Sequence, residues 1–393
     1  MKLYAQHGYG EGEKISQGLQ KGLISGVVYG AKDINPDRLR ERLGGIATSM
    51  PTAGRVLDPQ YYVSLIGSDP NIRLGKLEEY PYFTVRRRSQ LESNDLIKEE
   101  IRKVIEFQAG LPVSAIIAPN ILISRSFDSV EAVIAKNFIR QAKGIYEEYS
   151  DKRPLYVTLA ISREALIDFT ELEAFLNDVT LLDKQPDGFY LLVGARSVEA
   201  RTDLYNADVI AAWMLLNHSL KINGYEIING YSDLISPFLG AVGGDIGCTG
   251  WWSNLRTFSM DRFAPESTGG RQPVQRYLCT KLLNRITFYE LDALRRIFPE
   301  VVNGLSVDTE YLGEPERSIE VLQSWEALNS LLSTLTASSD PSRNVGKCTD
   351  AINYANDLYI SIRARYRLDP KSDDSHLEAL QEGMSLFKKR AEL

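Results

Sequence analysis

The chain is poor in the residue types that most often build metal centres and disulfide frameworks. It has three cysteines (Cys248, Cys279, Cys348) and three histidines (His7, His218, His376) among 393 residues, all far apart. Because there is no Cys-x-x-Cys pair and no His-rich stretch, the sequence predicts no metal site, no disulfide framework and no cofactor. Unpaired thiols are typical of a reduced compartment, so we expect a cytoplasmic protein.

Long hydrophobic runs are also lacking. No run approaches the roughly 18 apolar residues that a membrane span requires. The first residues, MKLYAQHGYGEGEKI, lack the apolar core of a signal peptide. A net charge of −7 gives no global signal for nucleic-acid or membrane binding, although a local basic patch is compatible with it. We therefore expect a soluble protein that does not contact a membrane.

What the chain does have is a series of short apolar runs bounded by Gly, Pro or Asn, a pattern typical of strands. Two runs, 114–118 and 189–193, are apolar on both faces, which indicates a parallel sheet covered by helices. The predicted strands are residues 26–31, 55–63, 113–119, 155–161, 188–193, 225–229 and 245–250.

Amphipathic helical stretches lie between many of these strands. They span residues 36–43, 94–108, 129–149, 171–178, 206–220 and 233–242. About seven βα units predict a (β/α)₈ TIM-like barrel, with an eighth strand near 257–263 or degenerate. An open doubly wound sheet is the main alternative, but no Gly-x-Gly-x-x-Gly follows the first strand.

Two regions depart from the βα rhythm. Residues 64–95 form a long insertion, and long loops inside compact domains are often functional. From residue 263 onward the chain reads as an α-helical C-terminal appendage to a barrel of residues 1–262. Its predicted helices are 275–298, 318–335, 344–367 and 375–392.

The segment 243–256, GGDIGCTGWWSNLR, is the most distinctive stretch of the chain. Its glycines allow close approach of a ligand or of another backbone, and Cys248 reads as a small buried hydrophobe. Trp251 and Trp252 are expected on opposite sides of an extended chain, with Trp251 as a stacking platform. Arg256 is expected to bind an anion or to pair with a carboxylate at the barrel rim.

The other candidate site residues follow predicted strands, because the carboxyl ends of the strands form the site of a TIM barrel. Asp58 is the candidate general acid or base, with a plain Asp-Pro turn as the alternative. Asp33 is interpreted as a cap of the helix that begins at Pro36. The predicted substrate-binding residues are Gln60, Tyr61, Asn120, Arg196, Asn229, Thr249, Gly250, Trp251 and Arg256.

The run Arg86-Arg87-Arg88 lies inside the insertion at 64–95. Three consecutive guanidinium groups can contact nucleic-acid phosphates, although short basic runs are often simply solvated. These arginines and the barrel mouth are the predicted nucleic-acid contacts, and the C-terminal helices are the predicted contact for a protein partner.

Residues 233–256 resemble the late barrel segment of tRNA-guanine transglycosylases, in which a helix leads into a Gly-x-Asp strand and an arginine-containing stretch. The strand around Asp58 also resembles that family's early Asp-Ser-Gly-Gly-Phe strand. The chain departs from the family in three ways: Cys248 falls near the position of its nucleophilic aspartate, Pro59-Gln60-Tyr61 replaces the Ser-Gly-Gly after the first aspartate, and its cysteine-rich zinc site is missing. The resemblance implies a barrel with insertions that exchanges or excises a nucleobase.

Three functions remain open from the sequence. The first is a barrel that binds a nucleotide-like or nucleic-acid ligand, with base or glycosyl transfer as its reaction. The second is a catalytically silent barrel scaffold in a multi-protein assembly that acts on nucleic acid. The third is a small-molecule barrel enzyme, for which Lys32 is the only lysine at a predicted strand end.

Overall fold

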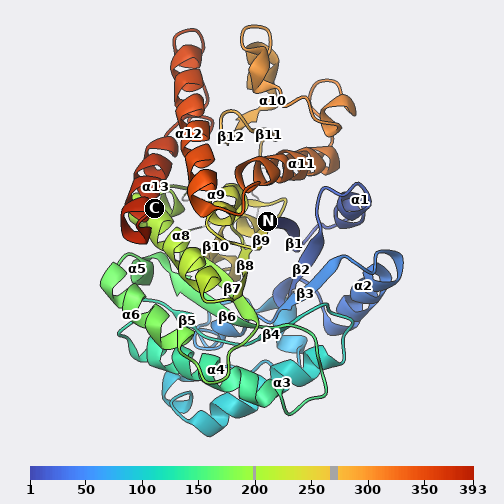
Figure 1. Cartoon of the computed structure of the whole chain (residues 1–393). Helices are drawn as coiled ribbons and strands as arrows, with labels where there is room; N and C mark the ends of the chain where they lie inside the picture. Colours follow the sequence, from blue (N-terminus) through green and yellow to red (C-terminus); the bar gives the residue numbers. More distant parts are fainter. Residues whose placement is uncertain (198–200, 266–272) are drawn as a thin grey trace.

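Eight parallel strands follow one another around a barrel in chain order (Figure 1). The computed structural model describes residues 1–197, 201–265 and 273–393. The barrel strands are β1 (Lys2–Gln6), β2 (Gly26–Gly30), β3 (Gly54–Asp58), β4 (Ile116–Ala118), β6 (Leu155–Ser162), β7 (Gly188–Ala195), β8 (Glu226–Gly230) and β9 (Ile246–Thr249). The last strand pairs with the first, and the β3–β4 seam is joined where the backbone N–H of Ser114 donates to the carbonyl of Arg55 at 2.8 Å. The predicted TIM-like barrel is confirmed.

The eighth strand lies at the opposite end of the chain from its predicted place. All seven predicted strands are barrel strands, and the missing one is β1, which pairs with β2 and β9. Residues 257–263 hold only the two-residue strand β10 (Phe258–Ser259), which pairs with β7, and a 3₁₀ helix, Met260–Phe263. The prediction missed β1 because its apolar residues Leu3, Tyr4 and Ala5 are flanked by the polar Lys2 and Gln6 within a polar, glycine-rich stretch.

Helices surround the barrel. They are α1 (Lys14–Gln20), α2 (Pro36–Ser49), α3 (Asn94–Ala109), α4 (Val130–Tyr146), α5 (Arg163–Leu166), α6 (Phe169–Thr180), α7 (Arg201–Leu204), α8 (Ala207–Ile222) and α9 (Ser236–Ala241). Side chains of Asn35, Ser93, Ser129 and Asn206 each accept the backbone N–H three residues on at the start of α2, α3, α4 and α8. Such caps satisfy donors that the first helical turn leaves open, which is why these helices begin where they do.

The barrel interior combines tyrosines with glycines. Tyr4 of β1 lies against the glycines that begin β2 and β3, and a Cβ on Gly54 would stand 2.0 Å from its hydroxyl oxygen. Tyr190 of β7 lies against Gly230 of β8 in the same way. A tyrosine ring therefore fills the space that a neighbouring side chain would otherwise take, so the barrel centre is a packed core.

The C-terminal region stands above the barrel in Figure 1 and is less helical than predicted. Residues 275–298 form a hairpin of β11 (Arg276–Cys279) and β12 (Asn284–Thr287) followed by α10 (Phe288–Leu294), rather than one helix. Three helices follow: α11 (Arg317–Leu335), α12 (Pro341–Arg363) and α13 (Leu377–Ala391). Because α11 packs against β1, α1 and α9, it takes the place of the barrel's eighth outer helix, and α13 packs along α8.

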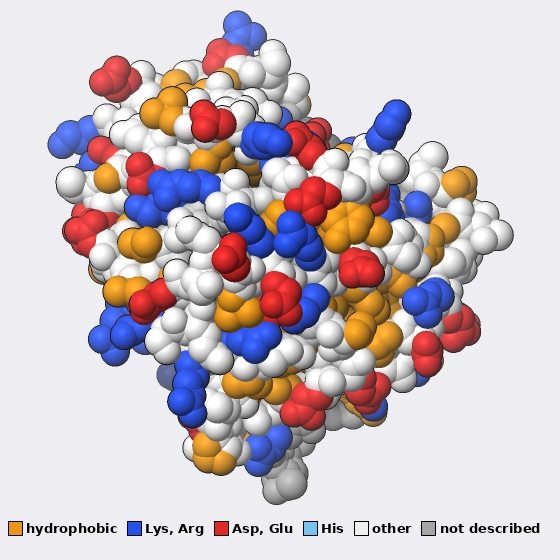
Figure 2. Space-filling model, turned by 90° about the horizontal axis from the view of Figure 1, so that it is seen from below, with side chains coloured by type: hydrophobic (Ala, Val, Ile, Leu, Met, Phe, Trp, Pro, Cys, Tyr) orange, Lys and Arg blue, Asp and Glu red, His pale blue; other side chains and the backbone are white. Residues whose placement is uncertain are grey.

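The long connection between β3 and α3 contains the predicted insertion at 64–95 and only short 3₁₀ helices. In it Arg86 donates to Glu100 at 2.7 Å, and Arg88 lies 3.4 Å from Glu131. Figure 2 shows the lower face of the molecule, where Lys and Arg side chains lie among Asp and Glu side chains. In the described part of the chain, no helix is long and apolar enough to cross a membrane.

Candidate functional site

Backbone conformations at the barrel mouth are unusual. Gln60, Tyr231 and Asp233 are non-glycine residues with φ of 53°, 52° and 39°, and they follow β3 and β8 directly. Such left-handed conformations cost energy and concentrate at sites where side chains must be held in one direction. The carboxyl ends of these two strands therefore carry the most constrained loops of the mouth.

Asp58, the predicted acid or base, lies at the end of β3 and is completely buried. Its carboxylate accepts the backbone N–H of Gln60 at 3.0 Å and the hydroxyls of Tyr62 and Tyr190 at 3.0 and 3.3 Å. Burial raises the pKa of Asp58 from 3.8 to about 6, although the charge of Arg262 and these hydrogen bonds oppose the rise. The carboxyl group thus titrates near neutral pH inside a ring of tyrosines.

Residues 258–263 close the mouth above Asp58. The ring of Phe258 lies 5.1 Å from Tyr62 and 5.6 Å from Tyr231, and Phe263 packs on Tyr62 at 6.4 Å. Arg262 enters the barrel, where it donates to the hydroxyl of Tyr231 and, at 2.8 Å, to Asp33. We call residues 258–263 the mouth plug, because Phe258 and Phe263 pack on Tyr62, whose hydroxyl donates to Asp58.

Asp33 is therefore an ion-pair partner of Arg262 rather than the predicted helix cap. The cap of α2 is Asn35, whose side chain accepts the N–H of Arg38. Asp33 lies two residues before the cap position, in the 3₁₀ helix Ala31–Asp33, and only the folded barrel brings it to an arginine 229 residues away.

Polar atoms without partners lie in the same region. Both amide atoms of Gln6 and the amide nitrogen of Gln60 are buried and make no hydrogen bond among the described residues, and the same holds for Nε of Arg262. Gln6 shares the inward face of β1 with Tyr4 because side chains alternate along a strand. Gln60 also accepts the backbone N–H of Lys32 at 2.7 Å, which ties β3 to the loop after β2.

Three of the predicted binding residues lie in the layer between sheet and helices, away from the mouth. Tyr61 donates to Glu100 of α3 at 2.8 Å, and Asn120 donates to the carbonyl of Ala135 in α4 at 3.3 Å. Asn229 of β8 accepts from Trp213 and Asn217 of α8, at 2.9 and 3.1 Å. Asn229 lies on the outward face of β8, since alternate positions of a strand face opposite sides. Tyr61 and Asn120 lie just after β3 and β4, and like Asn229 they hold a helix onto the barrel.

Arg196 remains at the rim, after β7. Its guanidinium is well exposed and lies 2.6 Å from Glu164, the second residue of α5. Its backbone carbonyl accepts the hydroxyl of Ser259 at 3.3 Å, but its side chain is not among the groups that bind Asp58.

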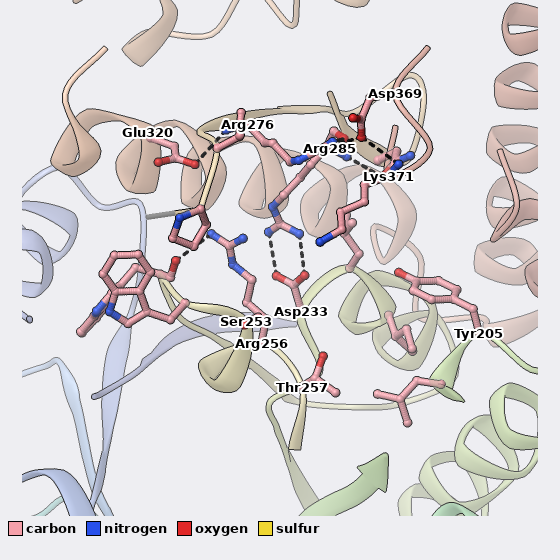
Figure 3. Close-up of a pocket in the computed structure, with 18 of the residues that line it drawn as sticks. Tyr205, Asp233, Ser253, Arg256, Thr257, Arg276, Arg285, Glu320, Asp369 and Lys371 are labelled. Atoms are coloured by element: carbon pink, nitrogen blue, oxygen red, sulfur yellow. Dashed lines mark hydrogen bonds and ion pairs between the residues drawn. The ribbon is translucent and has the colours of Figure 1, made fainter. Parts of the chain in front are cut away.

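A cleft of about 630 Å³ opens where the C-terminal region meets the loops after β8 and β9 (Figure 3). These are the seventh and eighth strands of the barrel. Residues 232–235 and 251–257 form its floor, and residues of β11, β12, α11 and 369–371 form its roof. Trp251 and Arg256 line it together with Trp252, while the predicted residue Thr249 reaches it only through Asp233, to which its hydroxyl donates at 2.6 Å.

The cleft carries an excess of positive charge. Arg256, Arg276, Arg285, Arg317 and Lys371 line it, against the three carboxylates Asp233, Glu320 and Asp369. Arg285 makes a bidentate contact with Asp233 at 2.6 and 2.8 Å, Arg276 lies 2.7 Å from Asp369, and Arg317 lies 3.1 Å from Glu320. Figure 3 shows Arg256 and Asp233 on the floor and Arg276 and Arg285 on the roof.

Arg256 differs from the other arginines of the cleft. It donates to the backbone carbonyls of Gly250 and Trp251 at 2.9 and 3.2 Å, and no described carboxylate lies within ion-pair distance of it. Burial lowers the pKa of Arg256 to about 10, and the neighbouring Arg285 adds to the effect. A partly buried guanidinium beside a second one favours the binding of an anion, although the charges of Asp233 and Glu320 offset part of this effect.

The indole N–H groups of the two tryptophans in the cleft point to the same acceptor, not to opposite sides of the chain. Both indole N–H groups donate to the carbonyl of Tyr9, at 2.8 Å from Trp251 and 3.1 Å from Trp252. The prediction of opposite faces was wrong because strand β9 ends at Thr249, so Trp251 and Trp252 lie in a bend and not in extended chain. Gly250 makes this turn compact, since a Cβ there would stand 2.4 Å from Leu255.

Sequence reasoning did not find the roof of the cleft. Arg276 and Arg285 lie in the predicted helix 275–298 and Arg317 directly precedes the predicted helix 318–335, and nothing in their spacing marks them as neighbours. The hairpin places Arg276 and Arg285 on antiparallel strands. Their convergence depends on the docking of the hairpin over β8 and β9.

The fold and cleft together define a class of protein: a TIM-like barrel whose mouth is plugged and whose seventh and eighth strands lead into a basic, tryptophan-lined cleft. The chain matches no protein-family model and no curated protein sequence.

Proposed function

We propose that this protein binds a nucleotide-like ligand in the cleft above β8 and β9, with the phosphate at Arg256 and Arg285 and the ring against Trp252. The carrying observation is Arg256, a largely buried guanidinium that bonds only to backbone carbonyls in the described part of the chain. An anion would supply the counter-charge that this group lacks.

The dimensions and location of the cleft support this proposal. Its volume of about 630 Å³ falls within the range of small-molecule sites, about 300–1,000 Å³. In TIM barrels the loops after the seventh and eighth strands frequently hold phosphate, and those loops form the floor here.

The aromatic wall supports a ring-bearing ligand over inorganic phosphate. Trp252 is partly exposed and the guanidinium of Arg317 lies 6.0 Å from its ring centroid, so one face of the indole is already a cation site. Bases stack on such surfaces with little preference for sequence. Arginine and tryptophan at one cleft thus match the two chemical parts of a nucleotide.

Base or glycosyl transfer, as the resemblance to tRNA-guanine transglycosylases implies, is the narrower form of this proposal. It requires Asp58 to reach the ligand as acid or base. Because the mouth plug lies over Asp58, that reaction needs residues 258–263 to move, and nucleotide binding in the cleft does not.

The test uses Arg256→Gln, which keeps hydrogen-bonding groups but removes the charge. We expect nucleoside monophosphates to quench the tryptophan fluorescence of the wild type, and Arg256→Gln to weaken binding about 10-fold or more, since charged hydrogen bonds contribute roughly 1.5–3 kcal/mol. Lys371→Gln, on the opposite wall, should weaken binding to a lesser degree.

Arg196→Gln is the matched control, because this exposed arginine lies outside the cleft and pairs with Glu164. Thermal unfolding of each variant separates loss of binding from loss of fold. Equal affinity of Arg256→Gln and wild type, or no nucleotide binding by the wild type at millimolar concentration, would contradict the proposal.

A second candidate function, a catalytically silent scaffold subunit, is favoured by the plugged mouth and by apolar side chains on the C-terminal region. Tyr289 is 81% exposed, Leu312 99% and Ile360 61%. Co-purification with products of neighbouring genes should then be lost in a Tyr289→Ser, Leu312→Ser, Ile360→Ser variant. Deleting 318–393 is less informative, because α11 covers β1 and its removal would expose the barrel core.

A further inference from the structure

A second cavity lies beside the cleft. It measures about 490 Å³ and is formed around the C-terminal end of α12. Its lining residues are Tyr359, Arg363, Arg365, Tyr366, Arg367, Leu368, Asp373 and Asp374. The composition repeats that of the cleft: arginines, aromatic rings and a smaller number of carboxylates.

The two cavities share a wall. Asn284 lines the cleft, and its amide donates to the hydroxyl of Tyr359 at 3.0 Å and to the carbonyl of Asp373 at 2.8 Å, both residues of the second cavity. Leu368 lines the second cavity and the next residue, Asp369, lines the cleft. Asn284 therefore belongs to the wall that the two cavities share.

The positive charge of the cleft continues into this cavity. Arg363 is paired with Asp374 at 2.6 Å, whereas Arg365 lies 5.7 Å over the ring of Phe298 and Arg367 is exposed. Across the described chain, no carboxylate lies within ion-pair distance of Arg365 or Arg367. Two uncompensated guanidinium groups thus stand next to a cleft that already carries more positive than negative side chains.

We propose that the cleft and the second cavity together hold a single-stranded polynucleotide, with one nucleotide in the cleft and the adjoining phosphates at Arg365 and Arg367. The inference rests on the proposed function, because the cleft supplies the first nucleotide site. Spaced phosphates match arginines spread over adjoining cavities, and bases match rings such as Trp252 and Tyr366. An acidic peptide would match the charges but offers nothing to stack.

The experiment measures binding of fluorescently labelled oligothymidylates of one to six nucleotides to the full chain. Wild type should bind the longer strands at least 10-fold more tightly than the mononucleotide. A variant with Arg365→Gln and Arg367→Gln should lose most of this gain and bind the mononucleotide as wild type does. Its slope of log affinity against log salt should be shallower by about 1.4, because each phosphate of a single strand that an arginine neutralises contributes about 0.7 to the slope.

Arg343→Gln is the matched control. Arg343 is exposed near the start of α12, the helix that Arg365 and Arg367 follow, and it lines neither cavity. Cations near a helix C-terminus also stabilise the helix itself. If Arg365 and Arg367 serve only to stabilise the fold, the double variant will have a lower melting temperature and the same dependence of affinity on strand length as wild type. That result would overturn the inference.

The remaining outcomes separate the two proposals. Mononucleotide binding without any gain from length overturns the strand but keeps the nucleotide site. A length-dependent gain that needs Arg365 and Arg367, without mononucleotide binding, supports the strand and overturns the mononucleotide as ligand. Polyglutamate that competes as well as an oligothymidylate of equal charge overturns the assignment to nucleic acid.

Discussion

At the scale of single residues, Asp58 is the group whose chemistry is most altered by its surroundings. It is buried against two tyrosine hydroxyls and held by the N–H of Gln60, and burial raises its pKa to about 6. A carboxyl group whose pKa is higher in the folded state favours folding when it is protonated. Its contribution to stability is fully present below pH 3.8 and is lost as the pH rises through about 6.

Wild type should lose stability as the pH rises and Asp58 ionises. We predict that Asp58→Asn, which cannot ionise, does not show this loss. Relative to this variant, wild type should become less stable by up to about 3 kcal/mol between about pH 4 and pH 7, as one pH unit of pKa difference corresponds to about 1.4 kcal/mol. Urea unfolding of both proteins across this range measures the difference. Parallel stability curves would show that Asp58 is ionised at no extra cost.

Patterns within a few residues predicted where a side chain lies along a strand. They did not predict which distant residues it contacts. Asp58 follows an apolar run directly, so its place at the end of a strand was predictable. Its partners Tyr190 and Arg262 come from β7 and the mouth plug, and the pairing of Asp33 with Arg262 spans 229 positions. Nothing local encodes such contacts.

At the scale of elements, most strands and helices could be predicted from hydrophobic periodicity and from the Gly, Pro and capping residues at their ends. Two predictions failed. Strand β1 was missed because polar residues flank its apolar run, and the β11–β12 hairpin was missed because its residues also satisfy a helical spacing. Both are strands whose identity depends on a neighbour, because a strand needs a hydrogen-bonding partner and a helix does not.

Glycines inside the barrel give a prediction at this scale. Gly54 lies on the inward face of β3, where a Cβ would stand 2.0 Å from the hydroxyl oxygen and 2.2 Å from the ring of Tyr4. Gly54→Ala should lower the free energy of unfolding by about 1–3 kcal/mol through overpacking. Gly45→Ala, in α2 with no atom within 4 Å of its Cβ, should instead raise it by up to about 1 kcal/mol. Chemical denaturation of the two variants checks the contrast, and equal effects would contradict it.

At the scale of the whole molecule, the C-terminal region is packed into the fold: its helix α11 completes the outer layer of helices around the barrel. Trp325 of α11 lies so close to α1 that a Cβ on Gly18 would stand 2.7 Å from its ring, and it also meets Trp251 edge-on at 6.5 Å. Arg285 of β12 reaches Asp233 after β8. Barrel and C-terminal region are thus joined at the cleft itself.

Asp233→Asn should loosen this junction. Burial opposes ionisation of Asp233, yet Arg285 outweighs it and holds the pKa at about 2, so the ion pair stabilises the fold above pH 3.8 and is lost as the pH falls through about 2. Asparagine tolerates the left-handed backbone at this position but leaves Arg285 buried without its counter-charge, at a cost of roughly 3 kcal/mol.

The matched control is Asp292→Asn. Asp292 of α10 forms a half-exposed ion pair with Arg295, which directly follows the helix. Removing an exposed pair should change stability by less than about 1 kcal/mol. Unfolding at about pH 7 compares the two variants, and a similar small effect of both would show that the Asp233–Arg285 pair does not hold the junction.

The sequence alone determined the barrel class, seven of the eight strands and most of the outer helices, because these depend on periodicity within a few residues. Only the tertiary structure decided that β1 closes the barrel, that residues 258–263 plug its mouth, and that arginines from the hairpin and α11 meet Trp251, Trp252 and Arg256. The physical reason is the same in each case. Such contacts join residues tens to hundreds of positions apart, and their geometry exists only once the sheet has closed and the C-terminal region has packed on it.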